Sequence, residues 1–168
     1  MKRKKNWAWA FLMVLVACSD DNNGGNETPP SGQPPVISEF TIWTGPTLTF
    51  QKSPGADPTL AENQDRITDN VWITRGNASG GQIYNAVTEQ AADMDLSPEG
   101  TLWAKGTTAN IENLTFDRFR ATLGKPKDNI DVDLVMLLVE DKIALDLKIT
   151  GWTQQQSGGF IYERSTME

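Results

Sequence analysis

Residues Lys142–Trp152 read KIALDLKITGW, and apolar and polar side chains alternate along them. The apolar positions are Ile143, Leu145, Leu147 and Ile149. The positions between them are Ala144, Asp146, Lys148 and Thr150. Because successive side chains of a strand point to opposite faces, this period of two predicts an antiparallel strand with one face on a core and the other toward water.

The preceding stretch, Val132–Glu140, is apolar on both faces. One face carries Leu134, Met136 and Leu138, and the other carries Val135, Leu137 and Val139. Such a strand is typical of the centre of a packed sheet, so we expect it to be covered on both sides. The two stretches meet at residues 140–142, where we expect a hairpin although the turn lacks an Asn-Gly pair.

Outward from this pair, period-two segments separated by Gly, Pro, Asn and Asp recur from Val36 onward. The predicted strands are Ile37–Trp43, Thr47–Gln51, Asn70–Arg75, Gln82–Thr88, Thr101–Lys105, Val132–Glu140, Lys142–Trp152 and Gly159–Arg164. A single helix is predicted at Phe116–Leu123, where Gly124 and Pro126 end an apolar stretch. The pattern predicts an all-β fold, an antiparallel β-sandwich of jelly-roll or Ig-like type over residues 36–168, with at most one short helix.

The N-terminus has the composition of an export signal. Four basic residues at positions 2–5 precede an apolar stretch from Trp7 to Val16 that is too short to span a bilayer. The run Leu15-Val16-Ala17-Cys18 resembles the lipobox of bacterial lipoproteins, in which the cysteine becomes the lipidated first residue. We therefore expect a signal peptide over residues 1–17 and a lipid anchor on Cys18, which makes a membrane one partner of the chain.

Residues 18–35 form the expected tether between anchor and domain. They are rich in Asp, Asn, Gly, Ser and Pro and carry no apolar residue that could anchor them after Cys18. Ser19-Asp20-Asp21 resembles the acidic export signal of surface lipoproteins of the Bacteroidota, and Ser19 is compatible with sorting to the outer membrane. The predicted location is the outer membrane, on the cell surface rather than the periplasmic leaflet.

Composition excludes several classes of function. The chain has 15 Lys and Arg and 22 Asp and Glu, and removal of residues 1–17 leaves 11 basic residues and a net charge of about −11. Such a surface repels phosphate backbones, so nucleic acid is not an expected partner. There is no histidine, and the one cysteine is Cys18, so imidazole and thiolate catalysis are excluded and we do not expect an enzyme.

Several segments together resemble a known sequence family. They are residues 62–77, 83–85, 100–108, 146–152 and 158–166. In amino-acid sequence they resemble an uncharacterised β-domain that recurs in secreted and surface proteins of marine and gut Bacteroidota. The resemblance spans nearly all of Phe50 to Thr166. It implies the fold, the compartment and the bacterial group, and it implies no activity, cofactor or catalytic residue.

Trp72 and Trp152 are the candidate ligand contacts, with Arg75 and Asp146 beside them. Neighbouring Val71 and Ile73 face the opposite side of the strand from Trp72, and Trp152 departs from the apolar face, which would bring it to the side of Asp146. Exposed aromatic side chains can stack on sugar rings, whereas buried ones pack a core, and both interpretations remain open.

The Trp72 strand is flanked by Gln64-Asp65-Arg66 and by Arg75-Gly76-Asn77. Guanidinium groups in such positions suit sugar hydroxyls or carboxylates, as in uronic acids, and equally suit the bonding of loop carbonyls. The flanks therefore leave ligand binding and loop structure as alternatives.

Acidic residues offer two weaker possibilities. Asp128, Asp131 and Asp133 alternate in a loop and predict a possible structural calcium ion, although the EF-hand glycine and glutamate are missing. The alternative is a solvated acidic turn. A carboxylate pair for glycoside hydrolysis can be drawn from five residues, but nothing in the sequence selects one pair: Glu89, Asp93, Asp95, Asp146 and Glu163.

The predicted function is that of a non-catalytic surface lipoprotein module that binds a glycan or polysaccharide. The alternative is a scaffold or adhesion module that binds another envelope protein, through an apolar patch or an open sheet edge. No cofactor other than the possible calcium ion is expected.

Overall fold

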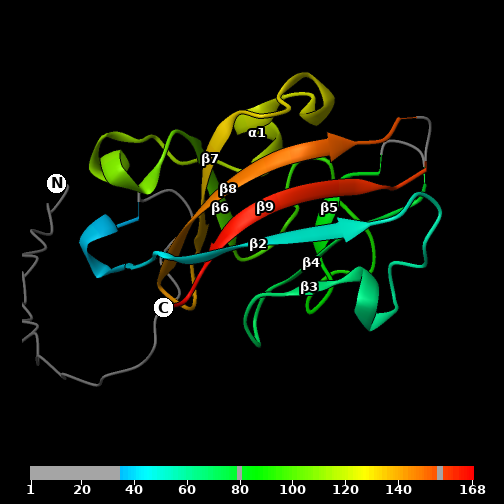
Figure 1. Ribbon diagram of the computed structural model, residues 1–168, viewed down its shortest axis with the longest axis horizontal. Helices are drawn as coiled ribbons and strands as arrows, with labels where there is room; N and C mark the ends of the chain where they lie inside the picture. The colour runs from blue at the N-terminus through cyan, green and yellow to red at the C-terminus, as the bar shows by residue number, and fades with distance from the viewer. Residues whose placement is uncertain (1–34, 79–80, 155–156) are drawn as a thin grey trace, which may run out of the picture.

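The computed structural model describes residues 35–78, 81–154 and 157–168, and within them two β-sheets pack face to face (Figure 1). The predicted all-β sandwich with one short helix is confirmed. The predicted signal peptide, Cys18 and all of the tether except Pro35 lie outside the described residues. No helix within the described ranges is long and apolar enough to cross a membrane.

The larger sheet contains the strands of the C-terminal half and the first long strand. Its order is β2 (Gly45–Lys52), β9 (Phe160–Thr166), β8 (Ile143–Trp152), β7 (Asp133–Leu138) and β6 (Thr101–Lys105), all antiparallel. A short strand, β1 (Thr41–Trp43), pairs in parallel with the beginning of β8. It fits there because β9 pairs only with the later part of β8, from Leu147 onward.

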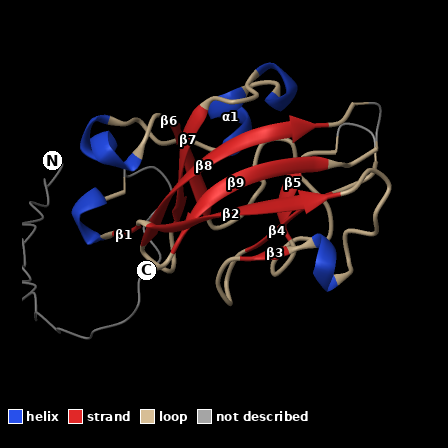
Figure 2. Ribbon diagram, viewed as in Figure 1, coloured by secondary structure: helices blue, strands red, loops and turns tan. Residues whose placement is uncertain are grey.

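The smaller sheet lies behind the larger one in Figure 1. It consists of β3 (Asp65–Arg66), β4 (Trp72–Arg75) and β5 (Ile83–Asn85), antiparallel and in that order. Helical segments lie around the strands rather than as a layer of their own (Figure 2). They are α1 (Phe119–Leu123) and the 3-10 turns η1 (Ile37–Glu39), η2 (Ala61–Asn63), η3 (Thr108–Asn113) and η4 (Pro126–Asp128).

The main core fills the space between the two sheets. It combines apolar residues of β4 and β5 with those of β7, β8 and β9, and Phe119 of α1 closes it on one side. A second, smaller cluster lies on the other face of the larger sheet: Phe40, Ile111, Val135, Leu137 and Ala144. Strand β7 is therefore buried on both faces, as its sequence predicts, and its hairpin with β8 forms with Leu138 opposite Ile143.

Several boundaries differ from the prediction, as in β5, which covers Ile83–Asn85 where a strand over Gln82–Thr88 was expected. Three of the differences have identifiable reasons. Residues 37–39 form η1 instead of a strand, because a 3-10 turn brings Ile37 and Phe40 to the same side, where both contact the small core. The helix begins at Phe119 because Asp117 makes a backbone bridge to Trp103, with N to O distances of 2.7 and 2.9 Å. Strand β3 was not predicted, since two residues are too few to display a period.

A β-bulge near the end of β8 reverses the expected side of Trp152. Ile149 lies opposite Tyr162 and Gly151 lies opposite Ile161, so Thr150 is an extra residue in this strand. Trp152 consequently lies opposite Phe160 and packs partly buried against the main core, with ring centroids 6.1 Å apart. The expectation that it shares the side of Asp146 is wrong.

A buried ion pair joins the two sheets. Arg164 of β9 donates to Asp65 of β3 through Nε to Oδ2, at 2.7 Å, and through Nη2 to Oδ1, at 2.9 Å. The hydroxyl of Tyr162 donates to the same carboxylate. Since both members of the ion pair are nearly inaccessible, this contact fixes how β3 sits on the larger sheet.

Candidate functional site

Trp72 lies on the outer face of the smaller sheet. Val71 and Ile73 are buried in the main core, and strand alternation directs Trp72 to the opposite side, as the sequence predicts. Its side chain is partly exposed. The indole Nε1 donates to the carbonyl oxygen of Thr68 at 3.0 Å, which holds the ring in one orientation.

A groove of about 540 Å³ lies beside this ring. It is lined by Pro58, Thr59, Gln64, Arg66, Trp72, Tyr84, Ala86, Glu89 and Gln90. The guanidinium carbon of Arg66 lies 4.0 Å from the centre of the Trp72 ring, and Arg66 Nη2 donates to Gln64 Oε1 at 3.1 Å. Burial, and then the charges of Asp57 and Glu89, raise the pKa of the Tyr84 hydroxyl, which therefore stays a neutral donor and acceptor.

Arg75, at the end of the same strand, points to the opposite face from Trp72. Its guanidinium carbon lies 3.8 Å from the centre of the Trp152 ring, so the structure brings these two predicted residues together. Arg75 Nε donates to Gly81 O at 2.8 Å and Nη1 donates to Gly159 O. Burial lowers the pKa of Arg75 to about 10.

A second, smaller hollow of about 240 Å³ opens next to the Arg75 and Trp152 pair. It is lined by Arg75, Gly81, Gln82, Arg120, Lys125, Pro126, Lys127, Trp152, Thr153 and Gln154. Four of these residues are basic and none is acidic. We refer to this hollow as the basic pocket.

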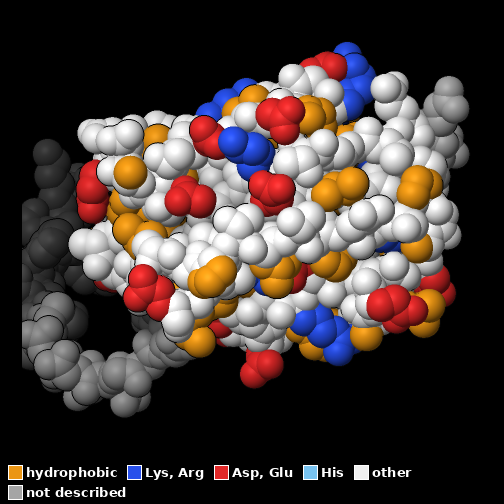
Figure 3. Space-filling view, viewed as in Figure 1, with side chains coloured by type: hydrophobic (Ala, Val, Ile, Leu, Met, Phe, Trp, Pro, Cys, Tyr) orange, Lys and Arg blue, Asp and Glu red, His pale blue; other side chains and the backbone are white. Residues whose placement is uncertain are grey.

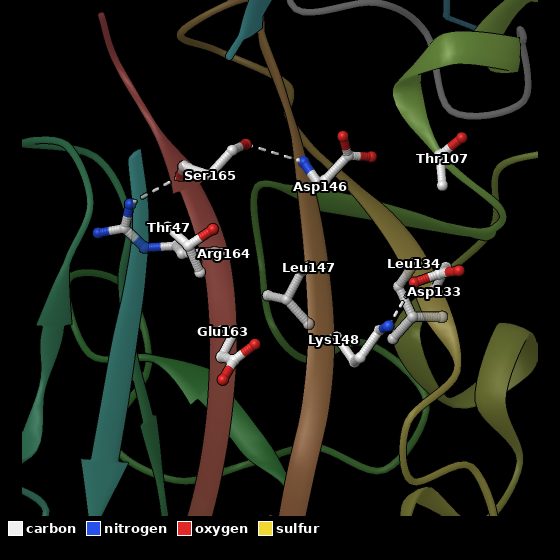
Figure 4. Close-up of a pocket in the computed structure, with 10 residues that line it drawn as sticks. All are labelled: Thr47, Thr107, Asp133, Leu134, Asp146, Leu147, Lys148, Glu163, Arg164 and Ser165. Carbon is white, nitrogen blue, oxygen red and sulfur yellow. Dashed lines mark hydrogen bonds and ion pairs between the residues drawn. The ribbon is translucent and has the colours of Figure 1, made fainter. Parts of the chain in front are cut away.

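Asp146 lies in a third place, on the outer face of the larger sheet. Its two carboxylate oxygens accept hydrogen bonds from Thr108 N at 2.7 Å and Thr108 Oγ1 at 2.8 Å, so the carboxylate holds the beginning of η3. It borders a shallow hollow of about 230 Å³ between β7, β8 and β9, drawn in Figure 4. In that view Lys148 bridges to Asp133, with 2.9 Å between Nζ and Oδ1.

The three acidic residues of the possible calcium loop, Asp128, Asp131 and Asp133, do not come together as a cluster of side chains in the described part of the chain. In residues 35–78, 81–154 and 157–168, no three acidic, histidine or cysteine side chains come together in a group that could hold a metal ion. Asp128 pairs with Lys127, and Asp133 pairs with Lys148. These ion pairs favour the alternative, a solvated acidic turn.

The four predicted contact residues thus lie in three places: Trp72 in the groove, Arg75 with Trp152 at the basic pocket, and Asp146 on the other sheet. The sequence analysis did not identify four residues that line the groove or the basic pocket: Tyr84, Gln82, Arg120 and Lys125. Tyr84 could have been found by alternation, because it lies opposite Thr74 and so on the face of Trp72. The remaining three approach from loops and α1, and no local pattern connects them with Arg75.

Comparison with family models, with curated protein sequences and with solved structures gave no match for this chain.

Proposed function

We propose that this protein is a non-catalytic, lipid-anchored module of the outer membrane that binds a glycan on the outer face of its smaller sheet. The observation that carries the proposal is a partly exposed Trp72 beside a groove of about 540 Å³. Aromatic rings stack on the apolar faces of sugars, and a rigid strand holds such a ring without cost on binding.

The polar lining of the groove suits hydroxyl groups. Gln64, Gln90 and the fork of Arg66 offer amide and guanidinium groups around the Trp72 ring. Amphipathic walls of this kind bind ligands that have both apolar faces and hydroxyl edges. The groove would then bind sugar units that lie along the sheet.

The lining of the groove favours binding without catalysis, because it contains a single carboxylate. Glycoside hydrolysis requires two carboxylates, and Glu89 is the one acidic residue among those that line the groove. Its Oε2 accepts from Asn85 N at 2.8 Å and from Glu99 N at 2.9 Å, so this carboxylate organises backbone.

A glycan array probed with the full-length chain tests the binding proposal. Trp72→Ala should weaken binding about tenfold or more, the effect of losing one stacked aromatic worth about 1–2 kcal/mol. Thr49→Ala, on the exposed part of β2, is the control and should bind normally. If Trp72→Ala unfolds the domain, or folds and binds glycans like wild type, Trp72 is not the ligand contact.

The anchor is tested separately. Cys18→Ser expressed in a bacterial host with an outer membrane should release or mislocalise the chain, because two or more acyl chains are needed for stable anchoring. Protease treatment of whole cells then distinguishes the cell surface from the periplasmic leaflet. Unchanged membrane fractionation of Cys18→Ser would reject lipid anchoring at this residue.

An envelope protein is the second candidate ligand, favoured by the edge of the larger sheet. Strand β2 ends the strand order and pairs with β9 on one side, and Leu48 on it is 37% exposed. An open edge can receive a strand from a partner. A protein that wild type captures from envelope extract and Leu48→Lys does not, together with a blank glycan array, would favour this candidate.

A further inference from the structure

The basic pocket brings together four positive charges, although the chain as a whole is acidic. Its cations come from three separate segments: Arg75 from β4, Arg120 from α1, and Lys125 with Lys127 from the loop around η4. The whole chain carries 22 acidic and 15 basic residues, yet no acidic residue lines this hollow. Figure 3 shows basic side chains, with acidic ones among them, along the upper edge of the molecule, where Figure 1 has α1 and the loop that follows it.

Arg75 is the buried member of this group, with 4% of its surface exposed. Its acceptors are neutral, Gly81 O, Gly159 O and Thr153 Oγ1, and among the described residues no carboxylate forms an ion pair with it. Burial alone depresses its pKa. A buried cation without a counter-charge is costly, and a bound anion would offset that cost.

Gln82 is an independent sign of a ligand at the same hollow. This residue is 97% buried and lines the pocket, and its Nε2 donates to Met94 Sδ at 3.4 Å. Its Oε1 is the one buried side-chain nitrogen or oxygen of the described residues that has no hydrogen-bond partner. Buried acceptors are nearly always satisfied, and a ligand hydroxyl in this hollow would supply the donor that the oxygen lacks.

We propose that the basic pocket binds a hydroxylated carboxylate, as in a uronic acid unit of an acidic polysaccharide. The carboxylate would bind the guanidinium and ammonium groups, and a hydroxyl would donate to Gln82 Oε1. A simple oxyanion satisfies only the first requirement, and a neutral sugar only the second. The volume of about 240 Å³ lies below the usual range for drug-sized ligands and suits a single sugar unit.

This site is separate from the groove of the proposed function. Trp72 does not line the basic pocket, and Arg75 and Trp152 do not line the groove. Acidic sugar binding here can therefore be present or absent whatever the groove binds, and Trp72→Ala should leave it unchanged.

Isothermal titration of the full-length chain with hexagalacturonate is the direct test. We expect binding that weakens as salt is raised, since the ion pairs are partly exposed. The fully methyl-esterified hexamer retains the hydroxyls and loses the charge, and it should bind at least about tenfold more weakly. Monomeric galacturonate distinguishes a site for one sugar unit from a site that needs the polymer, and inorganic sulfate tests for a simple oxyanion site.

Variants identify the residues. Arg120→Gln with Lys125→Gln changes the accessible rim of the pocket and should weaken hexagalacturonate binding about tenfold or more. Lys105→Gln with Lys142→Gln alters the net charge by the same amount away from the pocket and should have no such effect. Gln82→Met should weaken monomeric galacturonate and leave any sulfate binding unchanged; thermal unfolding of this variant checks that it is folded.

Four results would overturn the proposal. They are no binding of hexagalacturonate at low salt, equal binding of the methyl ester, sulfate binding as tight as that of galacturonate, and equal losses in the rim and control variants. A blank array for neutral glycans, with hexagalacturonate binding retained in Trp72→Ala, would reject the groove and leave this site standing.

Discussion

Arg164 and Arg75 are buried to nearly the same degree, with 6% and 4% of their surfaces exposed, but different groups surround their charges. Arg164 makes two charged hydrogen bonds to Asp65, at 2.7 and 2.9 Å. Arg75 has neutral oxygen acceptors and the ring of Trp152 at 3.8 Å. The first charge is neutralised inside the protein, and the second is not.

The pKa values of the two guanidinium groups shift in opposite directions. Burial by itself lowers the pKa of Arg164, but the hydrogen bonds and charge of Asp65 outweigh burial and raise it. For Arg75 burial acts alone and lowers the pKa to about 10. In a buried ion pair each charge neutralises the other, and the pair fixes one sheet against the other. A buried cation without a counter-charge can still bind an anion from outside the protein.

The largest effect is expected from Asp65→Ala. This change leaves Arg164 buried without a counter-charge, and the free energy of unfolding should fall by about 3–5 kcal/mol in urea titrations. Asp65→Leu combined with Arg164→Met should recover much of that loss, because both charges are then gone. A double variant no more stable than Asp65→Ala would mean that the stranded charge is not the cause.

Arg75→Met should cost less, about 1–2 kcal/mol of unfolding free energy. Gly81 O and Gly159 O lose a donor, but the cost of burying a lone cation disappears with it. Hexagalacturonate should raise the urea midpoint of wild type and not that of Arg75→Met. A loss as large as that of Asp65→Ala would make Arg75 structurally equivalent to Arg164.

Alkaline pH should reveal the tyrosine beside the Arg164 pair. Burial, and then the charge and hydrogen bond of Asp65, raise the pKa of Tyr162 well above its usual value of 10.0. Above pH 10 the unfolded chain releases this proton while the folded chain holds it, so stability should fall as pH rises. Unfolding measured against pH should become less steep in Tyr162→Phe.

Ultraviolet absorbance of tyrosinate provides the matching control. The chain has two tyrosines, and the pKa of Tyr84 is also raised. In Tyr84→Phe, where Tyr162 is the one remaining tyrosine, tyrosinate should therefore appear together with unfolding rather than before it. Reversible ionisation near pH 10 in folded Tyr84→Phe would contradict the role assigned to the Asp65 contact.

The smallest effect is expected from Lys148→Ala. Its ion pair with Asp133 joins β8 to β7 on the exposed side of the larger sheet, where the two side chains are 39% and 57% exposed. Water screens such pairs, so the urea midpoint should not change measurably. A loss comparable to that of Arg75→Met would mean that pairing, rather than burial, governs these charges.

The sequence predicted correctly two adjacent strands of the larger sheet, β7 and β8. The alternation in β8 and the doubly apolar β7 predicted a sheet centre that the structure confirms, because burial acts on each face of a strand independently. Trp72 was predicted to face away from Val71 and Ile73 for the same reason, and it does.

The errors arose where contacts distant in sequence override local pattern. The bulge at Thr150 places Trp152 on the core side of β8. The sequence of residues 149–152 alone does not predict this extra residue in the strand. Asp146 was predicted to lie near Trp72, Arg75 and Trp152, and it instead borders a separate hollow, where it holds Thr108, which is 38 residues away.

The sequence by itself determined the all-β class, the central hairpin and the side of the sheet on which Trp72 lies, since these follow from side-chain alternation within single segments. The tertiary structure alone decided which charges meet. Asp65 and Arg66 are adjacent in sequence, yet one turns inward to Arg164 and the other lies over Trp72. Arg75 and Lys125 are 50 residues apart and line one pocket, because the packing of the two sheets brings the end of β4 close to the loop after α1.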